Sequence, residues 1–200
     1  VILHAAKLRL QFRKYGYFSH MSAKPKILVT GGAGYIGSHT IVELLRSENY
    51  DVVSADNFSN STDKTFDRIK RITGHEVTNY NVDLTDISAS RKIFEDHEFE
   101  AVIHFAAFKS VGESVEEPDK YWHNNQGSLK NILTLQKEFN VKALVFSSSC
   151  SVYGNSEQLP AREDAQLPDA ESPYGATKQA GEVTIKEFCE DHKAHGAVAL

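Results

Sequence analysis

Residues 30–37 read TGGAGYIG, a glycine-rich turn that joins a short apolar run to a segment with helical apolar spacing. The glycines match G-x-G-x-x-G through Gly32, Gly34 and Gly37, and G-x-x-G-x-x-G through Gly31, Gly34 and Gly37. Without Cβ atoms the backbone can turn tightly and approach a pyrophosphate, and the helix N-terminus adds free N–H groups and partial positive charge. Glycine turns are common, but one placed between a strand and a helix predicts dinucleotide binding.

Short apolar strands alternate with helices through the rest of the chain. Such alternation builds β-α-β units, whose strands are parallel and covered on both faces. We therefore predict an α/β fold with a doubly wound parallel sheet, a Rossmann-type dinucleotide-binding domain. The predicted strands are Ile27–Thr30, Asp51–Ala55, Glu76–Tyr80, Ala101–Phe105 and Ala143–Phe146, with a further one beginning at Gly196. One predicted helix begins at Ile36, and four others cover Asp63–Ile72, Ser88–His97, Leu129–Phe139 and Tyr174–Asp191.

The composition is that of an ordinary globular protein, with 200 residues, 40% hydrophobic and 24% charged. It excludes disorder and collagen-like sequence, and no window approaches the roughly 18 apolar residues of a membrane span. The net charge of −5 argues against nucleic acid as the main partner. Cys150 and Cys189 are far apart in the sequence, which favours a reducing compartment and a cytoplasmic location. The closest histidine pair, His192 and His195, has no third ligand nearby, so we expect no metal site.

Both ends of the chain differ from its body. Residues 1–20 are basic and contain no acidic residue, as in an organelle transit peptide, but Met21 and its polar lead-in favour an extension upstream of a native start. We therefore divide the chain into a basic N-terminal extension, residues 1–24, and a dinucleotide-binding domain, residues 25–200. The last apolar strand runs to the end of the sequence, so we expect a piece of a longer protein.

Two aspartates follow predicted strands. Asp56 ends the second strand, where a carboxylate can accept hydrogen bonds from both ribose hydroxyls and repel a 2′-phosphate, which favours NAD over NADP. The alternative is an aspartate that only forms a turn before Asn57. Asp83 has the same position after the third strand, where it could meet the adenine or cap the following helix.

Tyr174 and Lys178 lie one helical turn apart, so their side chains share a face of the predicted helix. This spacing arises easily by chance, but here it opens the helix after the fifth strand, which ends in the serines of residues 147–151. An ammonium and a positively charged nicotinamide both favour a phenolate, so the tyrosine could act as a base while a serine relays the proton. The alternative is an ordinary helix start beside a serine-rich loop.

Five segments together resemble one family. They are TGGAGYIGSHT from residue 30, DNFSNS from residue 56, VIHFAAFKSVGESV from residue 102, FSSSCSVYG from residue 146 and SPYGATK from residue 172. The set is similar to the extended short-chain dehydrogenase/reductases and, within them, to the UDP-glucose 4-epimerases, over residues 27–200. Residues 104–124 are the most specific part, because KSVGES at 109–114 is not a generic dinucleotide-fold sequence.

The resemblance implies a role for each matching position. For the cofactor NAD, it places Gly31, Gly34, Tyr35, Ile36 and Gly37 at the pyrophosphate, Asp56, Asn57, Asn60 and Ser61 at the adenosine ribose, and Asp83 and Leu84 at the adenine. It places Phe105, Ala106, Ala107 and Lys109 along the central part of the cofactor, with Asn124 adjacent. Ser149 and Tyr174 would be catalytic, and Lys178 would orient the nicotinamide ribose and tune the tyrosine. Lys109, Ser149 and Tyr174 would contact the substrate, a UDP-hexose.

The implied reaction interconverts UDP-glucose and UDP-galactose, a step of galactose metabolism. Tyr174, assisted by Ser149, would take the proton of the C4 hydroxyl while a hydride moves to NAD; the 4-keto sugar would then present its other face to the returning hydride. The related sugar-nucleotide 4,6-dehydratases and decarboxylases typically carry an acidic residue after the catalytic Ser or Thr, whereas Cys150 and Ser151 follow Ser149 here. A non-catalytic NAD-binding fragment is a further alternative.

Two departures from the family pattern stand out. Residues 124–128 are one residue shorter than the familiar sequence, which leaves the register of the next helix open. The family's C-terminal portion, which grips the uridine diphosphate, would begin after Leu200, so we expect little turnover from these 200 residues alone. Relatives commonly dimerise through the helices at Leu129–Phe139 and Tyr174–Asp191, which suggests a homodimer, although Ile185 and Phe188 would serve the core equally well.

Overall fold

A computed structural model describes residues 24–155, 160–162, 167–191 and 196–199. It contains a six-stranded sheet in which all paired strands are parallel, in the order β3-β2-β1-β4-β5-β6. The strands are β1 (Lys26–Thr30), β2 (Asp51–Ala55), β3 (Thr78–Tyr80), β4 (Ala101–His104), β5 (Ala143–Phe146) and β6 (Gly196–Ala199). The order reverses between β1 and β4, as in doubly wound folds, so the predicted fold class is confirmed.

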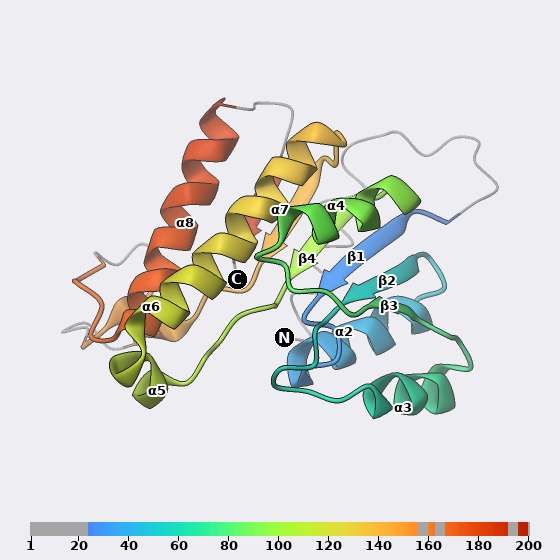
Figure 1. The fold of residues 1–200 in the computed structure, drawn as a ribbon, viewed down its shortest axis with the longest axis horizontal. Helices are drawn as coiled ribbons and strands as arrows, with labels where there is room; N and C mark the ends of the chain where they lie inside the picture. The colour runs from blue at the N-terminus through green and yellow to red at the C-terminus, as the bar shows by residue number, and fades with distance from the viewer. Residues whose placement is uncertain (1–23, 156–159, 163–166, 192–195, 200) are drawn as a thin grey trace.

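Helices cover both faces of the sheet (Figure 1). One layer contains α2 (Tyr35–Arg46) and α3 (Lys64–Thr73), and the other contains α4 (Ile87–Asp96), α7 (Gly127–Glu138) and α8 (Pro173–Asp191). Successive strand residues point to opposite faces, so Leu28 and Val102 pack in the α4–α7–α8 core while Val29 and Ile103 pack in the α2–α3 core. Ile185 of α8 is buried in the first of these cores.

Parallel pairing aligns the carboxyl ends of the central strands. Thr30 at the end of β1 is in register with Ala55 of β2 and with His104 of β4, and His104 is in register with Phe146 of β5. The loops that leave these four strand ends therefore start from one edge of the sheet, which is where doubly wound sheets bind ligands.

Most predicted boundaries agree with the structure to within two residues, and those of β2 and β5 match it. The prediction for the third strand began too early, because β3 starts at Thr78, opposite Val53, while Glu76 forms an ion pair with Lys70 of α3. Four short helical segments escaped the sequence analysis. They are α5 (Val111–Glu116), α6 (Pro118–Tyr121), the π-helix η1 (Trp122–Gln126) and the 3-10 helix η2 (Cys150–Tyr153).

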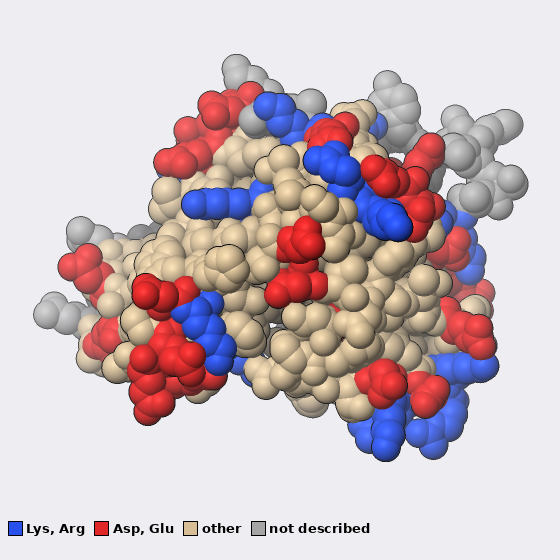
Figure 2. Space-filling view, in the orientation of Figure 1, with Lys and Arg blue, Asp and Glu red and all other residues tan. Residues whose placement is uncertain are grey.

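Some sequence-based expectations concern residues outside the described part. The basic segment of residues 1–20, Met21, and the pair His192 and His195 all fall outside it. Within the described ranges, no helix combines the length and apolarity needed to cross a membrane. On the face shown in Figure 2, acidic and basic side chains are interspersed, and no large basic patch covers it.

Candidate active site at the carboxyl edge of the sheet

The glycine turn lies at the point where the strand order reverses, between β1 and the end of β4. Gly31 has a positive φ of 68°, and a Cβ there would stand 2.8 Å from the backbone nitrogen of Ala106. A Cβ on Gly37 would stand 2.2 Å from the carbonyl oxygen of Gly31. Both distances are shorter than real Cβ contacts, so these two positions require glycine for the turn to close.

The first turn of α2 is open to an anionic ligand. Gly34 is its N-cap residue, no side chain caps its backbone N–H groups, and its first turn contains no acidic residue. Tyr35 and Ile36 are exposed, at 77% and 45% of their maximal surface. The positive end of the helix dipole is therefore left for a ligand such as a pyrophosphate.

Asp56 ties the glycine turn to the loop after β2. Its Oδ2 accepts a hydrogen bond from Ala33 N at 2.9 Å, and its Oδ1 accepts from Phe58 N at 2.9 Å and from Ser61 Oγ at 2.8 Å. Asn57 Oδ1 accepts from Ser59 N at 3.1 Å. Asp56 therefore hydrogen-bonds to both the glycine turn and the loop after β2. An aspartate that only formed a turn before Asn57 would bond within that loop alone.

The predicted adenine residues have different environments. Asp83 is exposed, and its Oδ1 accepts from Thr85 N and Oγ1 at 2.9 and 2.8 Å. Its alternative role as a helix cap is wrong, because Asp86 is the N-cap of α4 and accepts from the backbone N–H groups that begin it. The side chain of Leu84 is 5% exposed and belongs to the core.

The segment after β4 crosses the same edge. Phe105 N donates to Thr30 O at 3.1 Å, and Ala106 N donates to Thr30 Oγ1 at 3.4 Å, so the segment starts against β1. Ala107 is half-buried and Lys109 is exposed. Of the remaining predicted positions, Asn60 is exposed and Asn124 is half-buried, with its Nδ2 donating to Asn125 Oδ1 at 2.9 Å.

The fold brings the Ser, Tyr and Lys of the sequence analysis to the end of β5. Lys178 Nζ donates to Ser147 O at 2.8 Å and lies 4.7 Å from the centre of the Phe146 ring. Tyr174 lies one turn earlier on α8. Ser149 is the N-cap of η2 and accepts from Ser151 N and Oγ at 3.2 and 2.9 Å. Among the described residues no hydrogen bond joins Ser149 to Tyr174.

Burial shapes the protonation of two bases at this edge. Lys178 is 5% exposed, and burial lowers its pKa to about 8, so it stays mainly protonated at neutral pH. His104 is 2% exposed and hydrogen-bonded to Thr30 Oγ1 at 2.8 Å. Burial, with a smaller effect from the positive charge of Lys178, lowers the pKa of His104 to about 3. The edge therefore holds one ammonium beside a neutral imidazole.

Sequence reasoning missed three residues that build this site. His104 looked like the ordinary end of an apolar strand, Asn125 was one of two adjacent asparagines, and Thr177 stood unremarked between the tyrosine and the lysine. All three are buried polar residues with hydrogen bonds to other segments. The only sequence signal was their polarity, which stands out in an apolar element for His104 alone and marks exposed positions as well as buried polar networks.

Fold and site together define a dinucleotide-binding α/β protein with a Tyr–Lys pair. Residues 27–199 match the model of the NAD dependent epimerase/dehydratase family, and the chain belongs to that family. It is 50% identical over 162 residues to the UDP-glucose 4-epimerase of Bacillus subtilis and 41% identical over 184 residues to that of Drosophila melanogaster, which covers 81% and 89% of this chain. The crystal structure of the Bifidobacterium longum UDP-glucose 4-epimerase in complex with NAD+ and UDP superposes with a TM-score of 0.85, at 38% identity over 87% of this chain.

The chain spans about half the length of these relatives. It covers 47% of the Bacillus protein, 52% of the Drosophila protein and 52% of the Bifidobacterium chain. The similarity includes the glycine turn and the Tyr–Lys helix, which both lie within residues 27–199.

The close approach at Gly37 predicts a large cost for a single methyl group. Gly37→Ala should lower the free energy of unfolding by roughly 1–3 kcal/mol, because the new Cβ meets a backbone oxygen that cannot move freely. Gly112→Ala in α5 is the matched control. No heavy atom lies within 4 Å of a Cβ added at this position, so the substitution should leave the free energy of unfolding unchanged or raise it. Urea unfolding followed by circular dichroism measures both. Equal stability of the two variants would contradict the steric argument.

The buried imidazole predicts a pH dependence of stability. Because the pKa of His104 is lower in the folded state than in the unfolded chain, unfolding takes up a proton between about pH 3 and 6.5. This contribution is complete above pH 6.5 and falls by about 1.4 kcal/mol per pH unit as the pH drops below it. Relative to His104→Asn, the unmodified protein should lose about 2 kcal/mol between pH 6.5 and 5. Parallel stability curves for the two proteins would show that His104 is not held neutral.

Proposed function

We propose that this chain forms the NAD-binding part of a UDP-glucose 4-epimerase, which interconverts UDP-glucose and UDP-galactose by transient oxidation at C4. The observation that carries the proposal is the buried Lys178 ammonium at the end of β5, one helical turn from Tyr174 and on the same sheet edge as the glycine turn. The similarity to UDP-glucose 4-epimerases over residues 27–199 supports it.

The residues present fit an NAD molecule. Gly31 and Gly37 let the turn close, because a Cβ at either position would meet backbone atoms of this chain. The uncapped start of α2 then offers N–H groups to the pyrophosphate. Asp56 stands at the end of β2, where its carboxylate can accept from ribose hydroxyls and disfavour a 2′-phosphate. A ribose there would compete with the bonds that Asp56 now accepts from Ala33 N and Ser61 Oγ.

NAD, when bound, would supply the hydride acceptor and donor at C4. In this proposal Tyr174 removes the proton of the C4 hydroxyl. Ser149 accepts from Ser151, which leaves its own hydroxyl proton able to donate to the same oxygen. Lys178 keeps its positive charge beside Ser147 O and Phe146, where it can stabilise a Tyr174 phenolate and orient the ribose. Once the sugar presents its other face, Tyr174 would return the proton to the C4 oxygen, so that C4 is inverted.

The sugar-nucleotide dehydratases of the same family remain the second candidate. They need a further acid or base for the elimination step, whereas Cys150 and Ser151 follow Ser149 in this chain. The adenine contacts of Asp83 and Leu84, the homodimer and the cytoplasmic location stay predictions. Lys109 is the residue that we propose reaches toward the UDP-hexose, and its exposed side chain is consistent with this role.

Cofactor binding can be tested with two aspartates at opposite ends of β2. Asp56→Asn should weaken NAD binding at least tenfold and reduce the preference for NAD over NADP, because it removes the charge that accepts from the ribose and repels a 2′-phosphate. Asp51→Asn, at the exposed start of the same strand, should bind NAD like the unmodified protein. Calorimetric titration measures both dissociation constants. Equal affinities of the two variants would remove Asp56 from the site.

The chemical role of Tyr174 can be separated from binding. In the intact protein, Tyr174→Phe should lower turnover of UDP-glucose by at least about a hundredfold, since general acid–base catalysis is worth that much, with the NAD dissociation constant changed less than twofold. Tyr80→Phe is the control, because its hydroxyl bonds to Asp96 and His97, away from the Tyr–Lys pair. Turnover that survives Tyr174→Phe would exclude this tyrosine from proton transfer.

A further inference from the structure

Glu182 of α8 bonds to the segment after β5 but has no part in the proposed proton transfer. It lies eight residues after Tyr174, roughly 12 Å along the helix, which is too far for its side chain to touch the reacting oxygen. We propose that Glu182 is a positioning residue that holds Ser149 relative to Tyr174 by binding the neighbouring Ser148. The inference rests on the proposed function for the importance of Ser149 and Tyr174, but the geometry itself can be tested without turnover.

Ser149 and Tyr174 belong to different elements, although the proposed reaction needs both hydroxyls at one oxygen. Tyr174 is part of α8, whereas Ser149 begins η2 after the end of β5. Because no hydrogen bond in the described part joins the two side chains, their relative position depends on contacts between α8 and the residues on either side of Ser149.

Two side chains of α8 hold the residues just before Ser149. Lys178 Nζ donates to Ser147 O at 2.8 Å, and Ser148 Oγ donates to the carboxylate of Glu182. Ser147 N still continues the sheet pairing, because it donates to the carbonyl at the end of β4 at 3.2 Å. Ser148 is therefore the first residue beyond the sheet, and its bond to Glu182 ties its side chain to α8.

A third side chain of α8 holds the residues after Ser149. Gln179 Nε2 donates to Val152 O and to Pro168 O, both at 2.8 Å. Val152 N in turn donates to Ser149 O at 3.2 Å, so Gln179 is linked to the backbone of the serine. Ser149 is thus held to α8 from both directions along the chain, and Glu182 provides the side-chain contact on the side of β5.

The helix that carries these side chains is itself fixed in the core. Lys178, Gly181 and Ile185 are buried, and Ile185 packs in the α4–α7–α8 core. Glu182 is half-buried at the margin of this face. A charged acceptor makes a stronger hydrogen bond than a neutral one, so the carboxylate of Glu182 is a stronger anchor for Ser148 than an uncharged side chain would be.

The environment of Ser149 shows what the anchor controls. Its backbone is extended, with φ −155° and ψ 148°, and its Oγ accepts from Ser151 N and Oγ at 3.2 and 2.9 Å. If Ser148 loses its bond to Glu182, the chain before Ser149 can rotate, which moves the Ser149 Oγ away from Ser151 N. The amide of Ser151 therefore reports the position of the Ser149 hydroxyl.

Substitutions at both ends of the bond separate a positioning role from general packing. Glu182→Ala removes the acceptor and Ser148→Ala removes the donor, whereas Glu182→Gln keeps an oxygen that can accept. If Glu182 acts through Ser148, the double alanine variant is no worse than either single variant, because each change removes the same bond.

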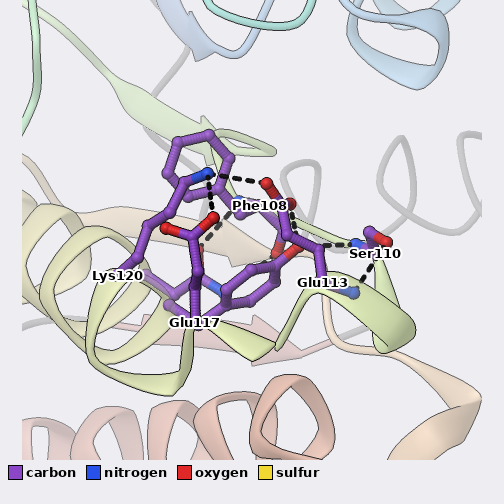
Figure 3. A network of polar contacts seen from close by, with 7 residues as sticks. Phe108, Ser110, Glu113, Glu117 and Lys120 are labelled. Atoms are coloured by element: carbon purple, nitrogen blue, oxygen red, sulfur yellow. Dashed lines mark hydrogen bonds and ion pairs between the residues drawn. The ribbon is translucent and has the colours of Figure 1, made fainter. Parts of the chain in front are cut away.

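Two other glutamates provide matched controls. Glu113 also has a hydroxyl partner, since it accepts from Tyr121 Oη and from Lys120 Nζ, both at 2.6 Å (Figure 3). Glu187 is exposed on α8 itself. Within the described ranges neither side chain bonds to residues 147–152, so alanine at either position should leave that segment in place.

The test is amide hydrogen exchange of the isotope-labelled chain, read at Ser151 relative to the amides of β5. Glu182→Ala and Ser148→Ala should each speed exchange at Ser151 about tenfold, the effect of losing one hydrogen bond, and the double variant should add nothing further. Glu182→Gln and the two control variants should keep this exchange slow.

Turnover gives a second readout. In the intact protein, Glu182→Ala should lower kcat for UDP-glucose at least about tenfold with KM changed less than about twofold, because Ser149 is displaced from the C4 oxygen while binding is retained. Glu182→Gln should restore kcat, a rescue that depends on the acceptor oxygen.

Three results would overturn the inference. The first is a Ser151 amide that exchanges at the same relative rate in Glu182→Ala as in the unmodified chain, and the second is a double variant that exchanges faster than both single variants. The third is an intact protein that converts UDP-glucose equally well with Glu182→Ala. Faster Ser151 exchange in Glu182→Ala, with no conversion of UDP-glucose by the unmodified intact protein, would instead support the positioning role and contradict the proposed function.

Discussion

The close approach of the β1–α2 turn to the end of β4 is the constraint on which the candidate site depends. At Gly31 the backbone adopts a left-handed conformation beside Ala106 N, and at Gly37 the first turn of α2 sits against the carbonyl of Gly31. These contacts are possible only without Cβ atoms. They hold the N-terminus of α2 against the segment after β4, at the edge where parallel pairing also places the end of β2. That edge is where the strand order reverses, so both halves of the sheet contribute residues to the site.

Electrostatics at the same edge follow from burial. The core around the end of β5 accepts one ammonium, on Lys178, because Ser147 O and the Phe146 ring replace part of its hydration. A second positive charge in this environment would be costly, and the imidazole of His104 accordingly stays neutral next to Thr30. The result is a buried positive charge on Lys178, one helical turn from Tyr174, the arrangement that the proposed proton transfer needs.

The sequence predicted the parts of this account that depend on local patterns. Apolar periodicity indicated the strands, the glycine turn located the reversal point, and the Tyr-x-x-x-Lys spacing indicated one helix face. It could not predict η1 or the hydrogen bonds of Asn125, because two adjacent asparagines give no sign of a π-turn and the partners of Asn125, Phe108 and Thr177, are 17 and 52 residues away. The neutrality of His104 likewise depends on tertiary burial, which no local pattern encodes.

The central claim is that the edge built by the glycine turn is a dinucleotide site. The most direct measurement is a titration of the isotope-labelled chain with NAD, followed through its amide resonances. The account predicts that the largest shifts fall on Gly34, Tyr35 and Ile36, at the uncapped start of α2, with smaller ones at the segment after β4, and that NADP produces them only at higher concentration. A folded chain whose amides at residues 31–37 do not respond to NAD would contradict it.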